Sequence, residues 1–292
     1  MIQVNQLTFT YPGKEKETIQ GISFSIEKGE IYGFLGPSGA GKSTTQKILT
    51  RLITGFEGRV KVMGKELKEW GDAYFNHIGV GFELPNHYPR LTGLENLQLF
   101  ASLYDKPVVN LNSLLSRVGL KDAAKQKTSD YSKGMKMRLN FARALIHDPE
   151  ILFFDEPTSG LDPVNANNLK DMIRELKAQG KTIFLTTHNM YDADELCDRV
   201  AFIHNGQIMA EDTPGYLKMK YGKPLLTLEY MDGQPVSRNF NLKDFGHDEE
   251  FLALVRQKDI VRVHSCEASL NDVFVKITGK KLVSFSDDYT ER

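Results

Sequence analysis

The chain has 292 residues, of which 40% are hydrophobic and 26% charged, as is ordinary for a globular protein with one large core or one large and one small domain. Lys and Arg number 37 against 38 Asp and Glu, which gives a formal net charge of −1. A dedicated nucleic-acid-binding protein normally carries a basic excess, so we expect no nucleic-acid partner. The two cysteines, Cys197 and Cys266, stand far apart in no metal-ligand spacing, which predicts a reduced protein.

The pattern of apolar residues indicates whether the chain is exported or spans a membrane. Residues 1–13 lack the basic and apolar regions of a signal peptide. No apolar stretch approaches the ~18 residues that a spanning helix needs. We therefore expect a cytoplasmic protein, and any membrane-spanning part of its system is expected on another chain.

The first elements in chain order are expected to be strands. Alternating apolar residues indicate half-buried strands at 2–9 and 22–26, and the apolar run at 31–35 indicates a buried strand. After a glycine-rich loop, a helix is expected over 42–53. The residues expected to face inward on that helix are Ile48, Leu49, Leu52 and Ile53.

Strands and helices then alternate. Short strands are expected within 60–85 and helices from 92 to about 147. Buried strands at 150–155 and 182–186 flank a helix over 164–179. Strands separated by helices predict an α/β fold, a parallel sheet with helices on both faces.

A second, smaller domain is expected after a predicted hairpin at Asn205-Gly206. Residues 1–220 are expected to form the first domain and residues 221–292 a small α+β domain. Within the latter, the sequence predicts a strand at 225–230 and a helix that Ser269 opens in capping-box spacing.

The glycine-rich loop Gly36–Ser43 (GPSGAGKS) meets the spacing G-x-x-x-x-G-K-S in full. Such a loop turns its backbone N–H groups onto a polyphosphate, and the following helix N-terminus favours negative charge. Lys42 would reach the β- and γ-phosphates and the Ser43 hydroxyl would ligate Mg²⁺. The alternative, a turn without a ligand, is disfavoured by the strand before the loop and the helix after it. The residues predicted to bind nucleotide here are Gly36, Pro37, Ser38, Gly39, Ala40, Gly41, Lys42, Ser43 and Thr44.

Three further polar residues follow buried strands. Asp155 is predicted to hold Mg²⁺, and Glu156 to orient or deprotonate the attacking water. His188 is placed to donate a hydrogen bond to the γ-phosphate. The alternatives are two solvated acids and a structural histidine. The functional interpretation is favoured because ligands bind at the carboxyl edge of such a sheet.

The segment Tyr131–Arg138 (YSKGMKMR) alone would predict only a helix N-terminus with Ser132 as its N-cap. In this order, however, the chain resembles the nucleotide-binding subunit of ABC (ATP-binding cassette) transporters, which carries the signature LSGGQ at this point. Ser132 and Gly134 match the signature, whereas the other three positions differ. Looser signatures of this kind are similar to those of antibiotic and drug exporters.

Further motifs follow in register. Ser159–Asp162 is similar to the family's D-loop and residues 187–199 to its H-switch. Tyr11 matches the aromatic residue that stacks on adenine, its alternative being a strand-end tyrosine. Glu83 stands where the family has the Gln of the Q-loop. A carboxylate can ligate Mg²⁺ as the amide oxygen does, but it adds negative charge beside the phosphates.

The resemblance covers about residues 1–220 and implies a RecA-like P-loop core, an antiparallel β subdomain and a helical subdomain with the signature. It implies a head-to-tail dimer, most simply of identical chains, with each ATP between one phosphate loop and the other chain's Ser132–Gly134. It also implies an ATPase on the inner face of the cell membrane that powers a separate permease. The residues given catalytic roles are Lys42, Glu156 and His188, with Ser43, Asp155 and Glu83 on Mg²⁺.

Export is favoured by segments 213–222 and 268–279, which resemble the tail of exporter ATPases whose permease is a separate polypeptide. The alternative for this tail is a small stabilising appendage with no regulatory task. Two alternatives stay open: a non-transport ABC ATPase, such as one for cofactor assembly, and a small-molecule kinase. The exporter-like tail disfavours the first, and a kinase has no use for the signature and D-loop. Cargo selection is expected to lie in the permease.

Overall fold

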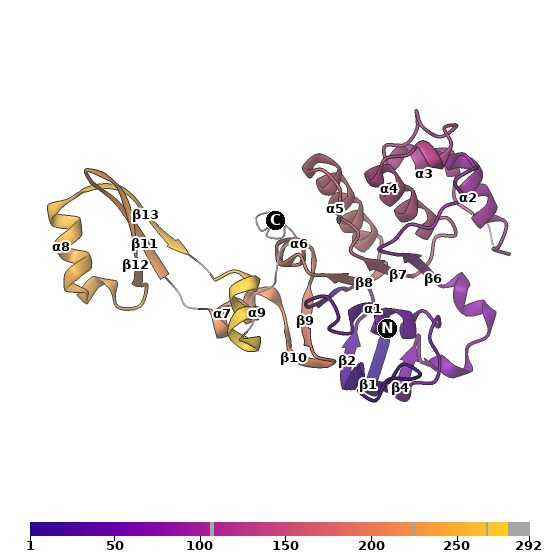
Figure 1. Ribbon diagram of the computed structural model, residues 1–292, viewed down its shortest axis with the longest axis horizontal. Helices are drawn as coiled ribbons and strands as arrows, with labels where there is room; N and C mark the ends of the chain where they lie inside the picture. Colours follow the sequence, from indigo (N-terminus) through magenta and orange to yellow (C-terminus); the bar gives the residue numbers. More distant parts are fainter. Residues whose placement is uncertain (106–107, 223–224, 267, 280–292) are drawn as a thin grey trace. The chain divides into compact units, whose positions relative to one another are not determined.

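The computed structural model describes residues 1–105, 108–222, 225–266 and 268–279 (Figure 1). The chain divides into two compact units, Met1–Glu211 and Asp212–Arg292. The expected domain division at residue 220 stays a prediction, and the part of the expected second domain after residue 279 lies outside the described residues. Within the described part of the chain, no helix is long and apolar enough to cross a bilayer.

Strands and helices alternate along much of the first unit, whereas the strands β11, β12 and β13 of the second unit pair antiparallel. The strands are β1 (Ile2–Phe9), β2 (Ile19–Ile26), β3 (Ile31–Leu35), β4 (Glu57–Val62), β5 (Lys65–Glu66), β6 (Ile78–Gly81), β7 (Ile151–Asp155), β8 (Thr182–Thr187), β9 (Arg199–His204), β10 (Gln207–Asp212), β11 (Leu225–Asp232), β12 (Gln234–Asn241) and β13 (Asp259–Cys266). The α-helices are α1 (Lys42–Leu49), α2 (Gly93–Ala101), α3 (Leu111–Arg117), α4 (Lys133–Ala144), α5 (Pro163–Ala178), α6 (Met190–Leu196), α7 (Pro214–Tyr221), α8 (Glu249–Gln257) and α9 (Leu270–Thr278).

A six-stranded sheet in the order β10-β9-β3-β8-β7-β6 forms the centre of the first unit. Strands β6, β7, β8, β3 and β9 pair with one another in parallel in this order. Every residue of β3, β7 and β8 is buried, as expected of strands covered on both faces. Strands β9 and β10 are joined through Asn205 and Gly206, which both have positive φ, so the predicted hairpin turn is confirmed.

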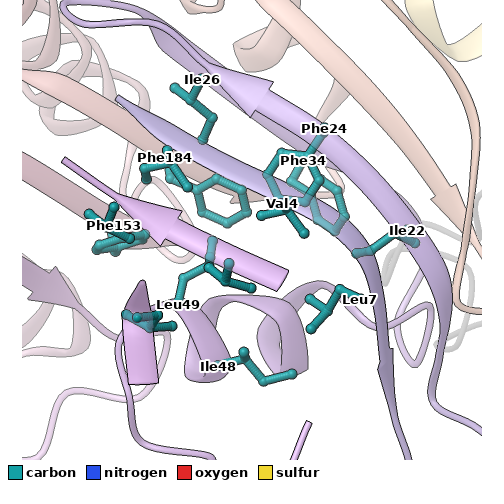
Figure 2. Close-up of a cluster of buried hydrophobic side chains, with 14 of the residues drawn as sticks. Val4, Leu7, Ile22, Phe24, Ile26, Phe34, Ile48, Leu49, Phe153 and Phe184 are labelled. Atoms are coloured by element: carbon teal, nitrogen blue, oxygen red, sulfur yellow. The ribbon is translucent and has the colours of Figure 1, made fainter. Parts of the chain in front are cut away.

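The second sheet, β2-β1-β4-β5, is antiparallel and shares one core with α1 and one face of the parallel sheet. Figure 2 shows this cluster, in which the Phe24 and Phe34 rings and the Phe34 and Phe184 rings each lie 5.5 Å apart. On the opposite face, Phe154 of β7 stacks on Phe141 of α4 at 4.7 Å. Each buried aromatic ring stabilises the fold by about 1.5–3 kcal/mol. Layers on both faces of a parallel sheet are thus confirmed.

Helix α1 is shorter than its sequence pattern predicts, because it ends at Leu49 rather than Ile53. The Thr50 hydroxyl donates to the Gln46 carbonyl at 2.9 Å, and Arg51 turns to a positive φ of 60°. Leu52 is therefore 56% exposed, and its expected inward orientation is wrong.

Helices α2, α3 and α4 begin at side-chain caps. Thr92 forms a capping box with Glu95, and Asn110 accepts from the Ser113 N–H. Ser132 accepts a hydrogen bond from the Met135 N–H at 3.2 Å, so the predicted N-cap of α4 is confirmed.

The second unit contains the sheet β12-β11-β13 and the helices α7, α8 and α9. The predicted strand at 225–230 lies within β11, and the Ser269 capping box begins α9, so both are confirmed. Helix α9 packs against α7, where the Lys276 ammonium donates to the Tyr221 carbonyl at 2.8 Å. A small hydrophobic core lies between this sheet and α8. It consists of Leu226, Leu228, Tyr230, Phe240 and Phe251.

Candidate functional site: a phosphate loop at the carboxyl edge of the parallel sheet

The glycine-rich loop joins the end of β3 to the start of α1. Gly41 has a φ of 113°, which L side chains rarely adopt, and a Cβ there would lie 2.6 Å from Ile19 Cδ1. A Cβ on Gly36 would lie 2.2 Å from the Ile203 carbonyl oxygen. Only glycine fits these two positions, so the sequence spacing sets the path of the backbone.

The Lys42 side chain folds back over this loop. Its ammonium donates to the Gly36 carbonyl at 2.7 Å and to the Pro37 carbonyl at 3.2 Å. Burial lowers the pKa of Lys42, although the charges of Glu156, Asp155 and Glu83 oppose that shift. A buried cation beside a cradle of backbone N–H groups suits a polyphosphate.

Asp155 closes β7 beside the first turn of α1. Its carboxylate accepts hydrogen bonds from the Thr186 and Ser43 hydroxyls. Burial raises the pKa of Asp155, while these two hydrogen bonds oppose the rise. The carboxylate and the Ser43 hydroxyl form a pair of hard oxygen donors, which is the donor chemistry that Mg²⁺ requires.

Glu156 is buried, and hydrogen bonds reach both of its carboxylate oxygens. One oxygen accepts from the Thr187 hydroxyl at 2.9 Å. The other accepts from the His188 backbone N–H at 2.9 Å and lies 2.7 Å from His188 Nδ1. The hydrogen bond to Glu156 raises the pKa of His188 despite partial burial, so the imidazole is a donor toward the carboxylate.

Glu83 is exposed on the segment after β6, and its charge acts on both Lys42 and His188. This segment is tied to α4 by hydrogen bonds from Asn140 Nδ2 to the Phe82 carbonyl at 2.6 Å and from Arg143 Nη1 to the Asn86 carbonyl at 3.0 Å. A third contact joins His87 Nε2 to the Lys136 carbonyl at 2.9 Å. Burial lowers the pKa of His87 to about 4, so its ring stays neutral near pH 7.

Tyr11 lies beside the phosphate loop. Its hydroxyl is 3.2 Å from the Thr44 hydroxyl, and its ring packs edge-on against Phe9 with centroids 4.9 Å apart. The ring is partly exposed, and the Lys14 ammonium lies over it, 6.0 Å from its centroid.

Ser132 and Gly134 lie elsewhere, at the start of α4. A Cβ on Gly134 would lie 3.3 Å from Leu161 Cδ2, and one on Gly160 would lie 2.8 Å from Lys133 Cε. The signature segment therefore contacts the D-loop of its own chain. Among the described residues, no hydrogen bond or ion pair joins it to the phosphate loop. The other candidate residues lie together around the phosphate loop and the ends of β7 and β8, whereas Ser132 and Gly134 lie apart from them.

Sequence reasoning missed three polar residues that connect the site. The Thr186 hydroxyl contacts both Asp155 and Gln46 Oε1, the latter at 3.3 Å, and the Thr187 hydroxyl holds Glu156. The signal was available as two adjacent threonines at the end of a buried strand, immediately before His188.

Known proteins match this chain along its length. A family model described as ABC transporter matches residues 19–159. The fluoroquinolones export ATP-binding protein of Mycobacterium tuberculosis strain H37Rv is 52% identical, and the alignment covers 97% of this chain and 94% of that protein. The bacitracin transport ATP-binding protein BcrA of Bacillus licheniformis is 31% identical, over 96% of this chain and 97% of that protein.

Solved structures match as well. One is a dimeric ATP-binding cassette in a post-hydrolysis state bound to ADP and Pi, with a TM-score of 0.67 and 27% identity over 73% of this chain and 98% of that chain. An ATP-binding subunit of an ABC transporter gives a TM-score of 0.69 at 28% identity, over 76% of this chain and 93% of that chain. The expected fold is confirmed. The chain therefore belongs to the ABC transporter family, as an ATP-binding subunit with a P-loop cassette that binds and hydrolyses ATP.

Proposed function

We propose that this chain drives an exporter and works with a membrane permease that is a separate polypeptide. The names of the relatives support export, because the 52% identical protein is named for fluoroquinolone export and the 31% identical protein for bacitracin transport. A further relative, 31% identical over 96% of this chain and 86% of that protein, is the Nod factor export ATP-binding protein I of Neorhizobium galegae. None of these names favours a non-transport ATPase.

The position of Glu156 carries the proposed chemistry. The carboxylate stands at the end of β7, held by Thr187 and His188 within the same charge cluster as Lys42. An acid fixed there orients a water molecule toward the γ-phosphate and accepts its proton, which contributes about 10²–10⁴-fold. Lys42 and His188 offset the negative charge that the transition state spreads over the phosphate oxygens.

Mg²⁺ is proposed as the cofactor, held by Ser43, Asp155 and Glu83. Within the described residues, no group of three His, Cys, Asp or Glu side chains is arranged to hold a metal by itself. We propose an ion held jointly by Ser43, Asp155 and Glu83 and by the phosphates of the nucleotide. When bound, the ion supplies positive charge against the β- and γ-phosphates.

A second copy of the chain is proposed to complete each ATP site. The first observation behind this is that Ser132 and Gly134 stand apart from their own phosphate loop, at the N-terminus of α4, where positive dipole charge favours a phosphate. The second is that related cassettes are dimeric. In this arrangement Tyr11 stacks on adenine, and the pair sits at the cytoplasmic face of the membrane on its permease.

Glu156→Gln tests the chemistry and the dimer together. With Mg²⁺ and ATP, we expect turnover to fall by about 10²-fold or more, because the amide accepts no proton. ATP should then trap the dimer, seen as a doubled mass on a sizing column. Glu175→Gln is the matched control, since this exposed side chain pairs with Arg117 on the surface. Retained turnover would reject the role of Glu156, and a persistent monomer would reject the shared site.

The transport function is tested by affinity purification of the tagged chain from detergent-solubilised membranes. We expect a polypeptide with several membrane spans to co-purify. A cofactor-assembly enzyme in its place would favour the non-transport alternative. Efflux of a fluoroquinolone from cells is the first cargo assay, because the 52% identical relative is named for it. Efflux should require Lys42 and disappear in Lys42→Ala.

A further inference from the structure

Asp192, in the first turn of α6, is a buried carboxylate that the proposed hydrolysis does not use. It is 7% exposed. One oxygen accepts hydrogen bonds from the Thr158 hydroxyl at 2.7 Å and from Asn189 Nδ2 at 3.0 Å. Its other oxygen lies 3.6 Å from the Lys170 ammonium. Removing a carboxylate from water is costly unless donors or opposite charges surround it, and this one has two hydrogen-bond donors and one nearby cation.

Its two hydrogen-bonding partners belong to the segments that follow β7 and β8. Thr158 stands two residues after Glu156. The Asn189 backbone N–H donates to the Thr187 hydroxyl at 2.9 Å, and that hydroxyl donates to Glu156 at 2.9 Å. Starting from Asp192, the contacts therefore run through Asn189, Thr187 and Glu156, along the backbone to Thr158, and back to Asp192. This closed ring has the water-orienting carboxylate as a member.

Glu156 needs such support because its backbone is strained. Its φ is 49°, in the left-handed region that costs a non-glycine residue about 1–2 kcal/mol. The residue is fixed on one side by its N–H, which donates to the Thr186 carbonyl at 2.9 Å. On the other side the chain continues through Pro157 to Thr158, whose hydroxyl is held by Asp192.

Lys170 places a positive charge beside the Asp192 oxygen that takes no part in the ring of contacts. The residue is 4% exposed and pairs with both Asp192 and Glu195. Burial lowers the pKa of Lys170, but the Glu195 hydrogen bond and the Asp192 charge outweigh it, so the net shift is upward. A cation thus faces one oxygen of Asp192, while two hydrogen-bond donors reach the other.

We propose that Asp192 is a positioning residue for ATP hydrolysis. Through Thr158 and Asn189 it holds the backbones that carry Glu156 and His188 at one fixed spacing. It does so without touching the nucleotide. The inference rests on the proposed role of Glu156, because the ring matters to turnover only if that carboxylate orients the water.

Substitutions at Thr158 give the sharpest test. Thr158→Val keeps the shape and removes the hydroxyl, whereas Thr158→Ser keeps the hydroxyl. We expect Thr158→Val to lower kcat by about 10-fold or more with the KM for ATP within about 2-fold, because a small misplacement of a catalytic group slows chemistry without weakening binding. Thr158→Ser should stay within about 2-fold of wild type in both constants.

Asp192→Asn extends the test to the carboxylate itself. It should lower kcat to a similar extent, and the double variant Thr158→Val/Asp192→Asn should be little worse than either single variant, because all three break one ring. Asp171→Asn is the control: this carboxylate is 66% exposed, pairs with Arg174 on α5, and should leave kcat unchanged.

Wild-type kcat in a folded Thr158→Val overturns the proposal, as does a loss in Thr158→Ser equal to that in Thr158→Val. An Asp192→Asn variant that raises KM with kcat unchanged also overturns it. If Asp192→Asn does not fold, the Thr158 pair decides. Turnover retained in Glu156→Gln rejects the proposed role of Glu156. If turnover is lost in Glu156→Gln but kept in Thr158→Val, the role of Asp192 is rejected and the role of Glu156 stands.

Discussion

The parallel sheet of the first unit and the small sheet of the second are built differently. Every residue of β7 and β8 is buried, because layers cover both faces. In the second unit β11 packs Leu226, Leu228 and Tyr230 against Phe251 of α8, while Val261 and Val263 of β13 are 56% and 48% exposed. Strands covered on both faces leave only their ends accessible, and the polar residues Asp155, Glu156 and His188 gather there. A sheet covered on one face offers a surface rather than such an edge.

The largest effect that separates the two units is expected at Lys42. Lys42→Ala should abolish ATP binding and lower hydrolysis by about 10²-fold or more, because it removes the cation beside the phosphate loop. Lys258→Ala in the second unit is the matched control, since this ammonium pairs with Asp232 at 2.7 Å on the surface. Binding of a fluorescent ATP analogue measures both. Unchanged affinity in Lys42→Ala would contradict the site assignment.

Aromatic truncation should show how far each core extends. Phe184→Ala should cost the first unit about 3–5 kcal/mol of unfolding free energy, because the ring packs against Phe24, Phe34 and Phe153. Phe251→Ala should cost a similar or smaller amount. Its cavity falls in the second unit, so ATPase activity should persist. Denaturant melts with parallel ATPase assays measure both, and activity lost in Phe251→Ala before any unfolding would contradict independent cores.

A smaller effect is expected at Glu83. Glu83→Gln restores the amide typical of the family and removes one negative charge near Lys42 and His188. ATP affinity should change by less than about 5-fold, since an exposed charge is well screened. Titration with the same fluorescent analogue tests this. Loss of nucleotide binding would mean that Glu83 has a different place in the site.

The smallest effect concerns pH. The pKa of His188 is raised above its ordinary value of 6.5 in the folded chain, so its pairing with Glu156 stabilises the protein fully below about pH 6.5. That stabilisation is lost as pH rises through the raised pKa. The pair is partly exposed, so the gap in Tm between wild type and His188→Gln should be only ~2 °C at about pH 6 and smaller at about pH 9. A gap that widens with pH would contradict the pairing.

Sequence patterns predicted the local parts of the site well, because each depends on a short-range rule. Gly36–Ser43 follows from backbone geometry at fixed spacing, and the buried strand before Asp155 follows from a continuous apolar run. Contacts across the fold were not predictable. In the sequence, Asp192 is an ordinary acidic residue of a helix. Its partner Thr158 is 34 positions away in the chain, and only the fold brings the two together. The early end of α1 was not predictable either: the Thr50 hydroxyl bonds back to the Gln46 and Lys47 carbonyls, and Arg51 turns to a positive φ.

The hydrogen bonds between the Glu83 segment and α4 have a consequence for communication between two copies. One end of α4 carries Ser132, which we propose faces the partner's nucleotide. The body of this helix is hydrogen-bonded to Phe82, Asn86 and His87, beside Glu83, which we propose lies at the chain's own nucleotide. His87 stays neutral near pH 7, so its hydrogen bond to the Lys136 carbonyl of α4 does not change with pH in the physiological range. If two copies pair as proposed, we expect a displacement at one ATP to be transmitted along this helix to the other. We expect the two sites to act cooperatively, with a Hill coefficient for ATP above that of independent sites.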